Sequence, residues 1–70
     1  MKITDSNSFG NAVRHRRREL GYTQTNLSKL TGLSVSFISD LERGKRTIEL
    51  GKALYLANML GLDIRIERRG

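Results

Sequence analysis

The chain has 70 residues and no cysteine, which excludes a second domain of ordinary size, disulfide bonds, thiolate metal sites and cysteine nucleophiles. Thirteen Lys and Arg against seven Asp and Glu give a formal net charge of +6, which indicates either a well-solvated small domain or a surface that binds a polyanion. No apolar run is long enough to cross a bilayer and residues 1–3 do not begin a signal peptide, so we expect a cytoplasmic protein with no membrane partner.

Residues 1–7 form a polar N-terminal segment, and a first helix is predicted from about Ser8 to Leu20. Residues 5–8 are a cluster typical of helix starts, and Gly21 breaks the helical pattern at the other end. Apolar side chains recur at helical intervals and predict the buried face of this helix: Phe9, Ala12, Val13 and Leu20.

Four arginines crowd the second half of the first helix, where cations favour a helix C-terminus. A solvated basic face is the preferred interpretation of Arg16 and Arg18. Arg17 differs because it lies close to the inward face, one turn before Leu20. His15 has no Cys, His or acidic cluster at ligand spacing, so no metal site and no cofactor is predicted.

Two short helices joined by a glycine turn follow, at about residues 23–31 and 34–43. Thr23 and Ser34 are candidate N-caps of the two helices, and Gly32 supplies a left-handed turn between them. Apolar pairs three residues apart predict one buried face on each helix: Leu27 with Leu30, and Ile38 with Leu41. The second helix has a small, polar outer face, which is the geometry of a DNA-reading helix-turn-helix.

A fourth helix is predicted at about residues 49–60, and an alternating tail follows it. The apolar stripe of this helix is Leu50, Ala53, Leu54, Ala57 and Leu60, with Leu56 beside it. In the tail, Leu62, Ile64 and Ile66 alternate with polar residues, which is typical of a half-buried strand. Nothing else in the chain resembles a strand, so the tail either pairs with its own copy across a two-fold dimer or is disordered.

The ordered pattern resembles the lambda-repressor/Cro (XRE-type) helix-turn-helix family across roughly residues 8–62. The matching positions are Phe9-Gly10, Val13-Arg14, Arg17, Thr23-Gln24, Leu27, Gly32, Ser34, Ile38-Ser39, Glu42-Arg43-Gly44, Leu56-Ala57 and Leu60-Gly61. The resemblance implies an all-α DNA-binding domain of four to five helices at residues 8–61. Residues 62–70 then form a short β-strand and tail that pair across a dimer.

The resemblance also implies site residues. It places DNA base readout on Val35, Ser36 and Asp40, with Phe37 and Ser39 beside them. Core packing is the favoured alternative for Phe37, because aromatic side chains are seldom fully wet. Asp40 either accepts a hydrogen bond from cytosine or orients a neighbouring arginine such as Arg43.

Phosphate contacts are implied at the start of the helix-turn-helix and in the loop that follows it: Gln24, Ser34, Arg43, Lys45 and Arg46. Gln24 could instead only help to cap its helix. In the same family an arginine at position 17 pairs with the glutamate at position 42 and braces the first helix against the third. Asn26 stands where the family often has Glu, which predicts a weaker helix cap, and Ser28 requires a hydrogen-bond partner if it is buried.

The alternating tail is similar to that of HipB-type antitoxins, which neutralise HipA-type kinase toxins. This similarity implies a homodimeric repressor of a palindromic operator that regulates its own operon, and that is associated with the nucleoid when bound to double-stranded DNA. The alternative is a stand-alone phage-type or restriction-control regulator with no toxin partner. Catalysis is not expected, because one His, no Cys and no paired carboxylates leave no catalytic constellation.

Overall fold

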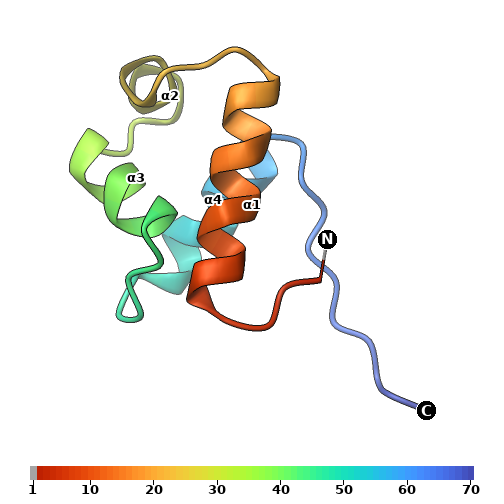
Figure 1. Ribbon diagram of the computed structural model, residues 1–70. Coiled ribbons are helices and arrows are strands. Elements are labelled where there is room, and N and C mark those ends of the chain that lie inside the picture. Colours follow the sequence, from red (N-terminus) through yellow and green to blue (C-terminus); the bar gives the residue numbers. More distant parts are fainter. Residues whose placement is uncertain (1) are drawn as a thin grey trace.

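The computed structural model describes residues 2–70 and shows a bundle of four helices (Figure 1). These are α1 (Ser6–Glu19), α2 (Gln24–Thr31), α3 (Val35–Glu42) and α4 (Leu50–Met59). Helix α3 packs against both α1 and α2, and α4 lies behind α1 in the view of Figure 1. Within residues 2–70 no segment forms a strand, so the all-α prediction is confirmed with four helices, while residues 62–70 of this single chain are irregular.

Helix α1 begins at Ser6, two residues before the predicted start, because Asp5 and Ser8 cap it reciprocally. The Asp5 carboxylate accepts a hydrogen bond from the Ser8 amide at 2.8 Å, and the Ser8 hydroxyl accepts one from the Asp5 amide at 3.1 Å. Two of the amides that lack a partner inside the helix are thereby satisfied.

Helix α2 has a complete capping box, although Asn26 stands where the resembled family often has Glu. The Thr23 hydroxyl accepts from the Asn26 amide at 3.0 Å, and the side-chain oxygen of Asn26 accepts from the Thr23 amide at 3.2 Å. An amide oxygen therefore replaces the carboxylate usual at this position. The Ser28 hydroxyl has the partner that it requires, because it donates to the Leu33 carbonyl at 2.6 Å.

The core lies between the four helices and is made of apolar side chains that are at most 2% exposed: Val13, Leu27, Ile38, Leu41, Ala53, Leu56, Ala57 and Leu60. Leu30 and Leu50 were predicted to belong to it, but they are 53% and 67% exposed. Both lie near the end of a helix, where no other element covers them. Leu56, which was expected beside the stripe of α4, is fully buried, and the predicted core residue Leu20 is 40% exposed.

Helices α1 and α3 approach each other closely at Gly10. A Cβ atom at this position would lie 2.3 Å from the Leu41 carbonyl oxygen and 2.8 Å from that of Glu42. Real Cβ atoms do not approach backbone atoms so closely, so only glycine fits here. The backbone of α1 thus sets the position of α3 directly.

Residues 62–70 leave the end of α4 and extend away from the helices (Figure 1). The tail is anchored at its start, where the Leu62 amide donates to the Ala57 carbonyl at 2.9 Å and the Leu62 side chain packs on the core. Farther along, Ile64 is 45% exposed and Ile66 is 98% exposed. None of the helices within residues 2–70 has the length and apolar character needed to span a membrane.

Candidate nucleic-acid interface

Helix α3 presents a short outer face that begins directly after its N-cap. The Ser34 hydroxyl accepts from the Phe37 amide at 3.0 Å and so starts the helix. Val35 is 39% exposed, Ser36 is exposed, and Ser39 is half-buried. The small exposed side chains are therefore concentrated in the first turn of α3.

Phe37 does not share this exposed position. Its ring is partly buried against the core, and the Lys52 ammonium lies 5.9 Å from the ring centroid. The position of Phe37 agrees with core packing, which was the predicted alternative to DNA contact for this residue.

Asp40 holds two cations that follow α3. Its Oδ1 accepts from the Arg43 guanidinium at 2.7 Å, and its Oδ2 lies 3.4 Å from the Lys45 ammonium. The Arg43 hydrogen bond is the main cause that lowers the pKa of the Asp40 carboxyl below its usual range, and Lys45 adds to the shift. Asp40 therefore orients both cations in this structure, which matches one of its two predicted roles.

Beneath the outer face, Arg17 and Glu42 form a bidentate ion pair between α1 and α3. Arg17 donates from Nε to Glu42 Oε2 at 2.7 Å and from Nη2 to Oε1 at 2.9 Å. Its Nη1 donates to the Tyr22 carbonyl at 2.8 Å, and the hydrogen bonds that Arg17 donates to the Glu42 carboxylate raise the pKa of Arg17. Each of the three guanidinium nitrogens of Arg17 thus donates a hydrogen bond inside the protein, so the pair has a structural role.

Gln24 joins this network through its side chain, which donates to Glu42 Oε1 at 3.1 Å. The side chain is therefore neither the cap of α2 nor extended toward solvent. The capping box uses the amides of Thr23 and Asn26, which leaves the backbone amides of Gln24 and Thr25 as the donors at the N-terminus of α2. These two amides, and the positive end of the helix, are suited to an anion.

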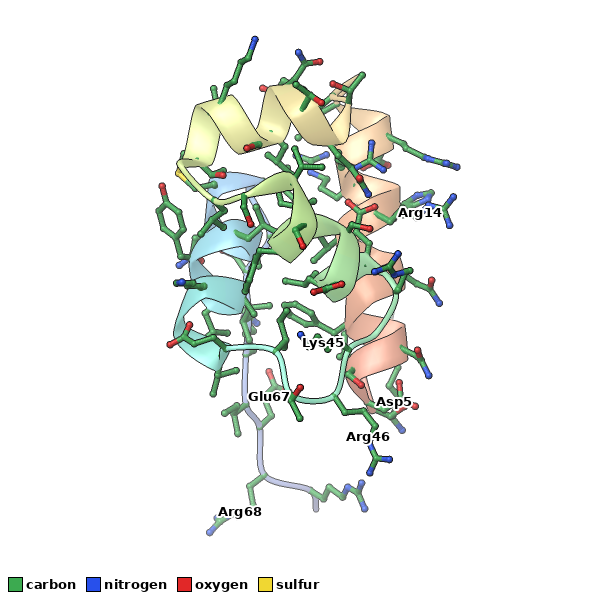
Figure 2. The ribbon with its side chains drawn as sticks, turned by 90° about the vertical axis from the view of Figure 1, so that its left-hand side faces the viewer. Asp5, Arg14, Lys45, Arg46, Glu67 and Arg68 are labelled. Carbon is green, nitrogen blue, oxygen red and sulfur yellow. The ribbon has the colours of Figure 1, made fainter. Side chains whose placement is uncertain are left out.

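Three cations lie in and beside the loop between α3 and α4. Arg43 and Lys45 are exposed and are held by Asp40, whereas Arg46 extends outward from the loop and meets no carboxylate within residues 2–70 (Figure 2). Gly44 permits the tight turn at φ +82°, and its buried backbone packs on Asn7. The loop is thus a fixed support for exposed positive charge.

Two side chains of α1 have contacts that the sequence did not indicate. Arg16 was expected on a solvated face, but its Nε donates to the Leu60 carbonyl at 2.9 Å and thereby closes the C-terminus of α4. A carbonyl 44 residues away leaves no periodic signal in the sequence. His15 lies 3.8 Å from the Glu19 carboxylate on the exposed side of the helix, and residues 2–70 contain no cluster of potential metal ligands.

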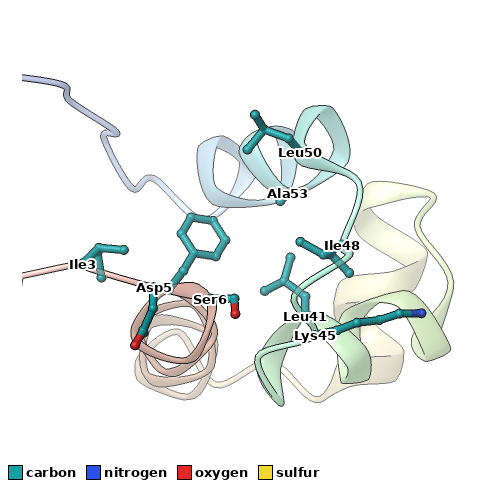
Figure 3. Close-up of a pocket in the computed structure, with 9 residues that line it drawn as sticks. Ile3, Asp5, Ser6, Leu41, Lys45, Ile48, Leu50 and Ala53 are labelled. Atoms are coloured by element: carbon teal, nitrogen blue, oxygen red, sulfur yellow. The ribbon is translucent and has the colours of Figure 1, made fainter.

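An apolar hollow of about 290 Å³ lies on another side of the molecule, between the N-terminal segment, α1 and the start of α4 (Figure 3). Its walls are mainly aliphatic and aromatic side chains: Ile3, Phe9, Leu41, Ile48, Leu50 and Ala53. The Lys45 ammonium points away from it (Figure 3). Through Phe9 and Leu50 it adjoins a second apolar groove, which includes Ile64 and Ile66 of the tail.

Comparison with known proteins agrees with this geometry. A family model described as helix-turn-helix matches residues 13–66. An uncharacterized HTH-type transcriptional regulator of Sinorhizobium fredii, y4mF, is 37% identical over 65 residues, which cover 93% of this chain and 86% of that protein. Chains in the solved HipB-O4 20mer complex and HipA-HipB-O2-O3 complex match 100% of this chain and 99% of their own length, with a TM-score of 0.87 and 24% identity. The chain therefore has the HipB-like fold and belongs to the helix-turn-helix family of DNA-binding transcriptional regulators, which are not enzymes.

Proposed function

We propose that this regulator is a sequence-specific repressor that acts as a homodimer on a palindromic operator in double-stranded DNA. The observation that carries the proposal is the division of α3 into two faces. Ile38 and Leu41 are buried in the core, whereas Val35 and Ser36 are exposed at the start of the helix. A helix held in this way can enter the major groove without disturbing the core.

Base readout is assigned to the outer face of α3. The Ser36 hydroxyl can donate or accept a hydrogen bond, and Val35 can contact a thymine methyl group. Ser39 lies one turn beyond Ser36. Phe37 supports this face by packing, and Asp40 meets the DNA mainly through the two cations that it orients.

Phosphate contacts are assigned to groups on both sides of this face. The free amides of Gln24 and Thr25 bind one phosphate at the N-terminus of α2, so Gln24 acts through its backbone while its side chain holds Glu42. Ser34, Arg43, Lys45 and Arg46 contact the backbone near α3 and the following loop. These contacts set affinity and register rather than sequence preference.

The dimer is assigned to the tail. Leu62 is anchored on the core, and Ile66 is almost wholly exposed in the single chain. Antiparallel pairing of two tails covers these side chains and satisfies their backbone groups. Two α3 helices then face half-sites about 34 Å apart, or one turn of DNA.

We further propose that the protein is the autoregulating antitoxin of a HipA/HipB-type pair, with a HipA-type kinase as its toxin. The support is the likeness over the whole chain to chains in the solved HipB-O4 20mer complex and HipA-HipB-O2-O3 complex. The protein acts in the cytoplasm and resides on the nucleoid when bound to its operator.

Selection of random duplex DNA by the purified protein tests the repressor proposal. A palindrome with half-sites one turn apart, bound far more tightly than scrambled DNA, is the expected result. Binding without sequence preference would contradict it.

The antitoxin proposal is tested by capture of the protein at native levels after nuclease treatment. A stoichiometric kinase in the captured material supports the proposal, and a clean homodimer favours a stand-alone regulator.

A further inference from the structure

A polar hollow between α1, α2 and α3 carries positive charge, part of which meets no carboxylate within residues 2–70. It has a volume of about 480 Å³ and is lined by Arg14, Arg17, Arg18, Gln24, Ser39, Glu42 and Arg43. Four guanidinium groups and one carboxylate line it, and one of the four, that of Arg43, is paired with Asp40. The floor is the Arg17–Glu42 pair, in which the two charges neutralise each other, so the net positive charge lies at the rim.

Arg14 and Arg18 account for most of this excess. They lie one helical turn apart on α1, both exposed, and both line the hollow. Within residues 2–70 neither guanidinium donates a hydrogen bond to a protein group or approaches a carboxylate within 4.0 Å. Like charges at this spacing repel each other and cost stability. The C-terminus of α1 favours a cation at Arg18, but it gives no reason for a second arginine one turn earlier, at position 14. Figure 2 shows Arg14 extending outward from α1.

We propose that Arg14 and Arg18 form an additional phosphate site, which binds one phosphodiester of the operator backbone at the rim of the hollow. Guanidinium groups bind phosphate oxygens in a bidentate manner, and two on successive turns can hold one phosphate from both sides. Gln24 lines the same hollow. The site on α1 therefore lies next to the phosphate contact proposed at the N-terminus of α2. The DNA-binding surface thereby includes a third helix. This inference rests on the proposed DNA binding and extends it.

The test compares three variants: Arg14→Gln, Arg18→Gln and the double variant. Lys29→Gln is the charge-matched control for each single variant, because Lys29 is exposed on α2 and does not line the hollow. Affinity for the selected duplex is measured over a range of salt concentrations. The double variant should bind more weakly and reduce the slope of log affinity against log salt by about 0.9 for one phosphate lost. Its preference for operator over scrambled DNA should not change.

A neutral methylphosphonate placed at each backbone position in turn distinguishes contact from long-range attraction. At one position, the methylphosphonate should weaken DNA binding by the wild-type protein but should not further weaken DNA binding by the double variant. The inference is overturned if no position shows this coupling, or if Lys29→Gln changes the slope as much as the arginine variants do. Because phosphate contacts do not depend on sequence, the slopes can be read on scrambled DNA even if the operator preference itself is absent.

Discussion

The Arg17 guanidinium and the Glu42 carboxylate meet in a two-bond pair at 2.7 and 2.9 Å, with side chains only 9% and 3% exposed. Two further bonds, to the Tyr22 carbonyl and from Gln24, complete the network. This pair holds α3 against α1. Loss of either partner would leave the other charge buried without a counter-charge.

Glu42→Gln should lower the free energy of unfolding by about 3 kcal/mol, because it leaves the Arg17 charge buried without its counter-charge. Urea unfolding followed by circular dichroism measures the loss. The double replacement Arg17→Met with Glu42→Leu should cost less than the sum of the single changes. Additive effects in this cycle would show that the two side chains do not interact.

Gly10→Ala should destabilise the protein by about 1–3 kcal/mol, because the new Cβ would overlap the backbone of Leu41. Gly51→Ala is the matched control in another helix. Its Cβ would meet only the end of the Glu49 side chain, at 3.2 Å, which caps α4 by accepting from the Lys52 amide, so the change should cost less stability than Gly10→Ala does. Equal effects of the two changes would argue against the close contact of α1 and α3.

Stability should fall on acidification partly through Asp5 and Asp40. The Ser8 amide is the main cause of the lowered pKa of Asp5, and the Arg43 hydrogen bond is that of Asp40. Each folded-state pKa lies below the unfolded value of about 3.9, so the stabilisation is present above that value and is lost as pH falls through the folded-state pKa. The variant with Asp5→Asn and Asp40→Asn should show a flatter decline in unfolding midpoint below about pH 4. An unchanged acid profile would contradict this assignment.

Ser36→Ala and Asp40→Ala should affect DNA binding in different ways. Loss of the Ser36 hydroxyl should reduce discrimination at one base pair by about 0.5–1.5 kcal/mol, the net value of one hydrogen bond. Asp40→Ala should instead change the affinity for all sequences together, because it releases Arg43 and Lys45. Competition assays with single-base operator variants measure both. If Asp40→Ala removed the preference for one cytosine, Asp40 would be a readout residue.

Ile66→Arg should shift the protein toward the monomer without loss of helical content. Ile66 is 98% exposed in the single chain, so a charge there is harmless to the fold but unfavourable in a paired tail. Sedimentation equilibrium measures the change, and Arg68→Gln is a control at a polar position of the same tail. A dimer that tolerates Ile66→Arg unchanged would place the interface elsewhere.

Helix order, both glycine turns at Gly21 and Gly32, and the caps at Thr23 and Ser34 could be predicted from sequence, because each depends on local chemistry. The exposure of Leu30 and Leu50 could not, because periodicity shows which residues share a face but not how far a neighbouring helix covers it.

The contacts of some long side chains could not be predicted from the sequence either. Arg16 closes the end of α4 and the Gln24 side chain turns inward to Glu42, although both residue types usually extend into solvent. Such contacts are determined by how α1, α2 and α3 are placed in space. For the same reason, the sequence does not indicate that Arg14 and Arg18 line one hollow with Gln24.

The backbone contact at Gly10 and the buried inner side of α3 have a consequence for how such a regulator changes over generations. The exposed side chains of Val35 and Ser36 are not among the groups that hold α3 in place, which include Phe37, Ile38 and Leu41. Substitutions of Val35 and Ser36 should therefore have little effect on folding, so the proposed operator can change while the architecture is inherited unchanged. A duplicated copy of the gene could diverge in target by a few surface changes alone.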